Sequence, residues 1–170
     1  RRALLRRESP SKAPTRSCMK PHELIISIPH SSTYIPKEIR DRMPHDDFVL
    51  NHEPDLFTDQ MYGVAGPRLI KARVSRVISD VNRAPDEIYT VGRERAAGVV
   101  MLSFSRGEDV FAKDPTLSEM ECWIDEFHRP FHDELRAAMG HAKFLIDGHS
   151  MWSLAPPSRP DAGRARPDVS

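Results

Sequence analysis

The fold is decided by the stretch Leu24-Ile25-Ile26-Ser27-Ile28, a short run of β-branched and other apolar residues interrupted by a single serine. Such a run is typical of a strand buried on both faces of a parallel sheet. The polar sequence Pro29-His30-Ser31-Ser32 follows at once, so a turn begins where the strand ends. We therefore expect residues 24–28 to lie at the centre of a sheet, with His30 near its carboxyl end.

Three further apolar runs, at residues 69–74, 77–81 and 144–146, have the length of buried strands. Within residues 119–139 the apolar side chains follow helical spacing, although Pro130 must kink or interrupt that helix. Strands that alternate with helices indicate an α/β domain. We predict a mixed, largely parallel sheet flanked by helices.

Length and composition limit the possible functions. The chain has 170 residues, 39% of them hydrophobic, and a formal charge of zero, which suits one domain. Without a basic or acidic excess, neither nucleic acid nor a membrane surface is the expected partner, and a small charged metabolite remains open. Since no apolar run approaches the ~20 residues of a membrane span, we expect a cytoplasmic protein. Nothing in the pattern specifies an oligomeric state.

The chain divides into two parts by composition. Residues 1–20 are rich in arginine, serine and proline and have little periodic apolar content, so we expect a disordered extension. Residues 21–170 form the expected folded domain, whose proline-rich end after Met151 is predicted to be a loop.

Four polar clusters lie where apolar runs stop, at residues 29–31, 55–59, 80–83 and 147–150. Open α/β sheets bind ligands at such places. A hydrolytic zinc site takes three ligands from histidine and carboxylate and leaves a fourth position for water. His30, an aspartate and His149 could supply this set, although a histidine taken singly is more often a hydrogen-bonded structural residue. Gly148 fits a turn that needs backbone freedom before His149.

Asp55 and Asp59 are four residues apart, so they would share one face of a helix that begins near Pro54. Either carboxylate could instead stabilise the first turn of that helix. We expect Asp55 to be the metal ligand and keep Asp59 as the alternative.

His128 and His132 are also four residues apart, and together they could in principle bind a metal ion. The glutamate that follows the first histidine in the helical metalloprotease motif is replaced by Arg129, and Pro130 distorts the helix. We therefore expect both histidines to support the site or to face the substrate, with simple packing as the alternative.

Arg76, Asn82 and Arg83 indicate an acidic substrate. Guanidinium groups hold carboxylates in bidentate fashion, and an asparagine amide can add a donor. Taken singly, each arginine could form an ordinary surface ion pair. Their place around the apolar run 77–81 favours substrate binding.

Taken in order, five motifs resemble the N-formylglutamate amidohydrolase family: Ile28-Pro29-His30-Ser31, Asp55-Leu56-Phe57-Thr58-Asp59, Ser75-Arg76-Val77-Ile78-Ser79-Asp80-Val81-Asn82-Arg83, His128-Arg129-Pro130-Phe131-His132 and Asp147-Gly148-His149-Ser150. The resemblance implies a fold similar to zinc carboxypeptidases and aspartoacylases. It also implies cleavage of N-formyl-L-glutamate to formate and glutamate during histidine degradation. Ser32 departs from the glycine that is common there.

The resemblance assigns one Zn²⁺ to His30, Asp55 and His149, and a substrate carboxylate to Arg76, Asn82 and Arg83. Family members continue past Ser170, so residues 21–170 are expected to be the N-terminal part of the catalytic domain. By analogy with carboxypeptidases, the glutamate that acts as general base would lie beyond this chain. Two alternatives remain: a zinc hydrolase of another N-acyl amino acid or peptide end, and a non-catalytic metal- or ligand-binding remnant.

Overall fold

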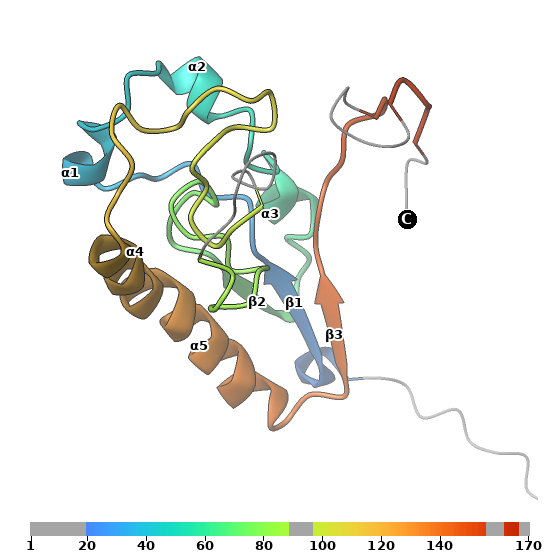
Figure 1. Ribbon diagram of the computed structural model, residues 1–170. Coiled ribbons are helices and arrows are strands. Elements are labelled where there is room, and N and C mark those ends of the chain that lie inside the picture. The colour runs from blue at the N-terminus through green and yellow to red at the C-terminus, as the bar shows by residue number, and fades with distance from the viewer. Residues whose placement is uncertain (1–19, 89–96, 156–161, 167–170) are drawn as a thin grey trace, which may run out of the picture.

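Three parallel strands form the sheet at the centre of the computed structural model, which describes residues 20–88, 97–155 and 162–166. They are β1 (Leu24–Ile28), β2 (Arg68–Lys71) and β3 (Phe144–Asp147), in the order β2-β1-β3 (Figure 1). The prediction of an α/β fold with residues 24–28 at the centre of a parallel sheet is confirmed. The expected extension, except for Lys20, lies outside the described residues.

The register of the sheet places the apolar residues of β1 between its two neighbours. Ile26 pairs with Leu69 of β2 and with Ile146 of β3. Ile25, Ile26 and Ile28 are at most 2% exposed, as expected for a strand covered on both faces. The side chains of β3 are less buried than those of β1, and Ile146 is 42% exposed.

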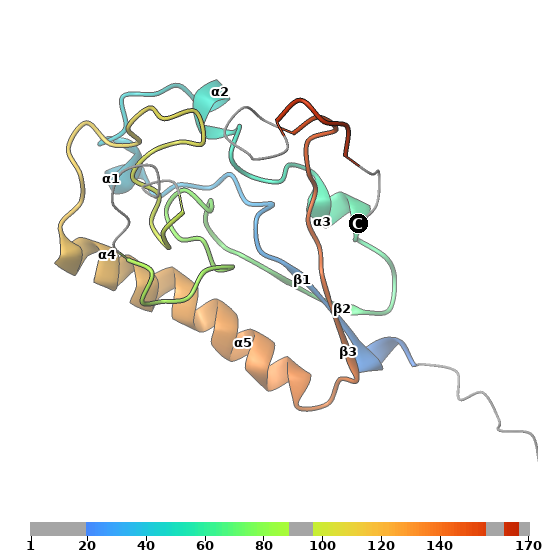
Figure 2. The ribbon, with the colours of Figure 1, turned by 45° about the vertical axis from the view of Figure 1, so that its right-hand side comes forward.

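Short helices and loops lie beyond the carboxyl ends of the strands, and longer helices run beside the sheet (Figures 1 and 2). The α-helices are α1 (Lys37–Arg40), α2 (Asp47–Leu50), α3 (Thr58–Met61), α4 (Leu117–Trp123) and α5 (Arg129–Met139). A 3₁₀ turn at Pro21–Glu23 precedes β1. Within the described residues, no helix is long and apolar enough to cross a membrane.

The helix predicted for residues 119–139 is present and is interrupted as expected. A π-helical turn, Ile124–His128, joins α4 to α5, and the N–H of Arg129 donates to the carbonyl of Ile124. Pro130 is the second residue of α5. Proline lacks an N–H and its ring meets the carbonyl four residues back, so a wider turn just before it removes this conflict.

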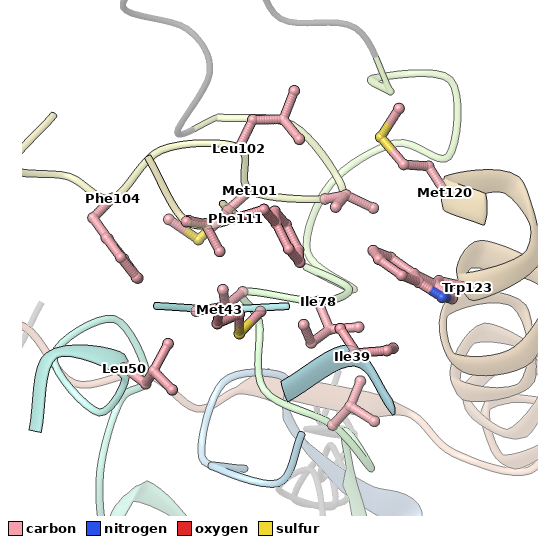
Figure 3. Packing of buried hydrophobic residues seen from close by; sticks show 14 residues of the cluster. Ile39, Met43, Leu50, Ile78, Met101, Leu102, Phe104, Phe111, Met120 and Trp123 are labelled. Atoms are coloured by element: carbon pink, nitrogen blue, oxygen red, sulfur yellow. The ribbon is translucent and has the colours of Figure 1, made fainter. Parts of the chain in front are cut away.

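Two clusters of buried side chains make up the core. One lies between the sheet and α5 and includes Ile25, Ile70 and Phe131. The larger cluster packs α4 against the loops, with Trp123 pointing toward Phe111 (Figure 3). The rings of this pair are stacked with their centroids 5.9 Å apart.

The prediction of a strand at residues 77–81 is wrong. These residues are buried, but they lie in turns and irregular backbone. The N–H of Ile78 donates to the carbonyl of Ser75, and the N–H of Asp80 donates to the carbonyl of Val99. Burial without sheet pairing produces the same continuous apolar pattern as a buried strand, so the sequence alone does not separate the two.

The burial difference between β1 and β3 makes a prediction about stability. Ile25→Ala should lower the free energy of unfolding by about 2–5 kcal/mol, because it leaves a cavity in the core. Ile146→Ala removes the same atoms from a half-exposed site on the neighbouring strand and should cost less than about 1 kcal/mol. Urea denaturation of both variants measures the difference, and equal losses would contradict this description of the core.

Candidate metal centre

Two histidines meet because they follow neighbouring parallel strands. His30 lies two residues after the end of β1, and His149 lies two residues after the end of β3. The carboxyl ends of parallel neighbours share one edge of a sheet, so both imidazoles project from that edge. Their ring centroids are 4.9 Å apart. His30 is 3% exposed, whereas His149 is partly exposed.

Asp55 reaches the same place from a loop and not from a helix. The expected helix near Pro54 begins only at Thr58, after Phe57 in a left-handed conformation with φ of 65°. The N–H of Asp55 donates to the carbonyl of His30 at 2.8 Å, which fixes the loop against the end of β1. Asp59 turns away, and its carboxylate accepts from the Lys71 ammonium at 3.1 Å.

One potential ligand atom from each of His30, Asp55 and His149 lies within 4.8 Å of the other two, so this group could hold a metal ion. Asp55 Oδ2 is 3.6 Å from His30 Nδ1 and 3.0 Å from His149 Nδ1. Ligands placed about 2.0–2.2 Å from a tetrahedral zinc are themselves roughly 3.3 Å apart. The two separations from Asp55 Oδ2 are therefore close to those of atoms that share one small cation.

The protonation of His30 is set by Asp80. His30 Nε2 lies 2.7 Å from Asp80 Oδ1, and a carboxylate only accepts, so this nitrogen carries the proton. The lone pair is then on Nδ1, which is buried and has no hydrogen-bond partner in the described structure. A metal-binding histidine commonly donates its other N–H to a carboxylate in this way.

Asp80 is itself held by several contacts. It is 2% exposed, and its Oδ2 accepts from Arg76 Nη2 at 2.6 Å. Oδ1 also accepts the N–H of Asn82 at 3.0 Å. Burial alone would raise the pKa of Asp80, but the hydrogen bond with His30 and the charge of Arg76 outweigh it and lower the pKa to about 2. The carboxylate is therefore charged at neutral pH.

His149 lies between two carboxylates. Its Nε2 is 3.0 Å from Asp147 Oδ2, and its Nδ1 faces Asp55. The hydrogen bonds to Asp147 and Asp55 raise the pKa of His149 to about 9 in the metal-free protein. The pKa of Asp55 lies well below its usual range, because hydrogen bonds to His149 and His30 outweigh the opposing effect of burial. These charges suit a cation better than an anion.

Gly148 is required for a different reason from the expected backbone freedom. Positive φ occurs at other glycines of the described chain but not at Gly148. A Cβ at this position would lie 2.9 Å from the ring of Tyr62, which is closer than real Cβ contacts. The hydroxyl of Tyr62 donates to the carbonyl of His149 at 3.3 Å, so Gly148 allows the tyrosine to pack against the turn that carries His149.

The three residues expected to bind substrate carboxylate lie in different surroundings. Arg76 is paired with Asp80, and its buried Nε has no partner in the described structure. Asn82 Nδ2 is 3.3 Å from His149 Nε2. The guanidinium of Arg83 is more accessible to a substrate than that of Arg76. Its side chain is 37% exposed, and Glu87 is 4.0 Å away.

His128 and His132 contact the backbone that carries Asn82 and Arg83. His128 Nε2 is 2.8 Å from the carbonyl of Arg83, and His132 Nε2 is 2.8 Å from the carbonyl of Val81. Neither belongs to the candidate metal group of His30, Asp55 and His149.

Asp80 and Asp147 belong to the sequence motifs, but no role was predicted for either residue. The signal that could have found them is their spacing from other site residues: Asp147 is two residues before His149, and Asp80 is two before Asn82. The contact between Asp80 and His30, which are 50 residues apart, required the fold. Glu119, another available carboxylate, pairs with Arg42 and caps α4.

The parallel sheet carries two histidines and an aspartate at its carboxyl edge, and this group could hold a metal ion. The family model for N-formylglutamate amidohydrolase matches residues 22–170, and the chain belongs to that family. The resemblance found in the sequence motifs is thereby confirmed. No curated protein sequence matches the chain.

Two solved structures share the fold. The N-formylglutamate amidohydrolase from Ralstonia eutropha JMP134 is 22% identical with a TM-score of 0.68, and the match covers 76% of this chain and 54% of that one. A gene product from Agrobacterium tumefaciens is 16% identical with a TM-score of 0.62, over 85% of this chain and 56% of that one. The chain thus spans about half the length of these structures.

The contact between Asp80 and His30 makes a prediction about metal affinity. Asp80→Asn removes the charge that fixes the His30 proton on Nε2, so the affinity for Zn²⁺ should fall by roughly 10- to 100-fold. Asp86→Asn makes the same change at an exposed position of the neighbouring loop and should have no effect. Titration calorimetry against a competing chelator measures both variants. An unchanged affinity in Asp80→Asn would show that His30 does not bind the metal through Nδ1.

Proposed function

We propose that this protein is a zinc-dependent amidohydrolase that cleaves the formyl amide of N-formyl-L-glutamate to formate and L-glutamate. The observation that supports it most is the buried Nδ1 of His30, which has no hydrogen-bond partner in the described structure and faces Asp55 and His149. An unpaired buried nitrogen is costly unless a ligand completes it. Membership in the N-formylglutamate amidohydrolase family supports the reaction.

The donor set suits zinc. Two imidazoles and one carboxylate are a common three-ligand set for catalytic zinc, which keeps a further position open. A zinc ion held there would polarise the amide carbonyl and lower the pKa of a water molecule. The chain's own residues would hold this arrangement: Asp80 and Asp147 orient the two imidazoles, and Asp55 supplies the negative ligand.

The substrate carboxylate would bind to Arg83 at the edge of the site. Within the described residues, the ion partner of Arg83 is Glu87, whose carboxylate lies 4.0 Å away, and Arg83 follows Asn82, which contacts His149. A guanidinium fork can hold a carboxylate through two parallel hydrogen bonds. Contacts remote from the reacting amide would orient it over the metal. Arg76 would act through Asp80 instead of touching the substrate.

Removing the metal tests the reaction directly. After dialysis against a chelator, hydrolysis of N-formyl-L-glutamate should stop, and one equivalent of Zn²⁺ should restore it. Metal content is followed by mass spectrometry and formate by a coupled assay. Full turnover in protein verified as metal-free would rule out the zinc mechanism.

Arg83→Ala should lower kcat/KM for N-formyl-L-glutamate at least about tenfold, because a hydrogen-bonded contact to a charged group contributes roughly 1.5–3 kcal/mol. The loss should disappear with a substrate that lacks the side-chain carboxylate. Arg76→Ala should instead slow both substrates, since it loosens Asp80. The control is Arg136→Ala, which removes an exposed guanidinium that pairs with Asp133 on α5. Equal losses on both substrates in Arg83→Ala would assign it a structural role.

A second substrate class is favoured by an apolar groove beside the site. This groove has a volume of about 520 Å³ and opens next to Asp55 and His149, since Pro54 and Ser150 line it. Phe48, His52 and Trp152 also line it, and the Phe48 and His52 rings are 4.4 Å apart. An N-acyl amino acid with a bulky apolar group would bury it there.

A panel of acylated amino acids separates the two substrate classes. If N-acetyl-L-phenylalanine reacts faster than N-formyl-L-glutamate, and Trp152→Ala removes that preference, the groove determines the substrate. If N-formyl-L-glutamate is preferred and Trp152→Ala has no effect, the groove does not select the substrate and the proposal of an acidic substrate is retained.

A further inference from the structure

We propose that His128 and His132 are positioning residues that hold the turn Asp80–Arg83 against both imidazoles of the candidate metal centre. The inference deepens the proposed function and rests on metal binding by His30, Asp55 and His149. It assigns a specific task to two histidines that the sequence placed only in the vicinity of the substrate.

The segment that they hold is a tight turn. The N–H of Arg83 donates to the carbonyl of Asp80 at 3.1 Å, and the N–H of Asn82 donates to the Asp80 side chain at 3.0 Å. In a four-residue turn closed this way, the carbonyl of the second residue points outward and receives no bond from the turn itself. That carbonyl belongs to Val81, and Val81 is 2% exposed, so a partner from elsewhere is required.

The same turn contacts both metal-site histidines. At its first residue, the Asp80 carboxylate accepts from His30 Nε2 at 2.7 Å. At its third residue, the Asn82 amide lies 3.3 Å from His149 Nε2. Its last residue is Arg83, the candidate for binding substrate. A rotation of this one turn would therefore shift the orientation of both imidazoles and of the guanidinium together.

His128 and His132 supply the missing partners from the helix. They are four residues apart, so they lie on one face where α5 begins, and their ring centroids are 4.5 Å apart. His132 Nε2 meets the carbonyl of Val81, and His128 Nε2 meets the carbonyl of Arg83, both at 2.8 Å. Carbonyl oxygens only accept, so both nitrogens must carry hydrogen.

The π-helical turn Ile124–His128 sets the direction of this face. A π turn contains about one residue more than an α turn, which rotates the following helix by roughly 100° relative to a regular continuation. In this chain the π turn ends at His128. Trp123 can then pack into the core cluster around Phe111 while His128, 3% exposed, faces the turn Asp80–Arg83.

Paired substitutions distinguish positioning from packing. His132→Leu removes the donor at the Val81 carbonyl, whereas His132→Gln keeps an amide donor that can reach it. We expect Zn²⁺ affinity to fall about tenfold in His132→Leu and to return toward wild type in His132→Gln. The same pair at position 128 should behave alike. His141→Leu, at an exposed histidine just after α5, is the matched control and should bind Zn²⁺ like wild type.

The visible spectrum of the Co²⁺-substituted protein gives a second readout, because its intensity and position report ligand geometry. The leucine variants should show an altered spectrum and the glutamine variants the wild-type one. A spectrum and a Zn²⁺ affinity that stay unchanged in leucine variants of lower thermal stability would make the two histidines purely structural and overturn the proposal.

Nitrogen-15 NMR of the wild-type imidazoles tests the proposal without any substitution, so it decides even if the leucine variants do not fold. His128 and His132 must both carry hydrogen on Nε2, and that hydrogen should exchange slowly. A ring with hydrogen on Nδ1 and none on Nε2 would overturn the proposal. If the protein binds no Zn²⁺ while both rings show the predicted tautomer, the proposed function fails and the structural description of the turn stands.

Discussion

The hydrogen bond between Asp80 and His30 is the interaction on which the candidate site depends. It joins an irregular buried segment to the end of the central strand at 2.7 Å, and both side chains are almost fully buried. Because a buried charge needs partners, Asp80 also draws in Arg76 and the backbone of Asn82. This one contact fixes the His30 proton on Nε2 and leaves the lone pair of Nδ1 directed at the candidate metal site.

The other two candidate ligands lie on segments that the fold brings next to the His30 imidazole. Parallel pairing of β1 with β3 brings His149 to the same edge, and a backbone hydrogen bond from Asp55 to His30 brings the carboxylate. None of the three candidate metal ligands lies on α4 or α5. These helices contact the site indirectly, through the hydrogen bonds of His128 and His132 to carbonyls of the turn that carries Asn82.

The parts of the fold predicted from sequence are those governed by local pattern. A local pattern predicted three elements correctly: the strand at residues 24–28, the strand that precedes His149, and the helix interrupted at Pro130. In each, the spacing of apolar residues or the position of proline fits one kind of secondary structure. Residues 77–81 were predicted wrongly because an apolar run records burial but not hydrogen bonding. The pairing of Asp80 with His30 depends on contacts across 50 residues, which no local pattern encodes.

The central claim is that one metal ion binds between His30 Nδ1, Asp55 and His149. Anomalous diffraction at the zinc edge, from crystals grown with Zn²⁺, locates the ion without reference to activity. The account predicts one strong peak about 2.0–2.2 Å from His30 Nδ1, an Asp55 carboxylate oxygen and a His149 nitrogen, with Asp80 still on His30 Nε2. A peak at the His128 and His132 pair, or none at His30, would contradict it.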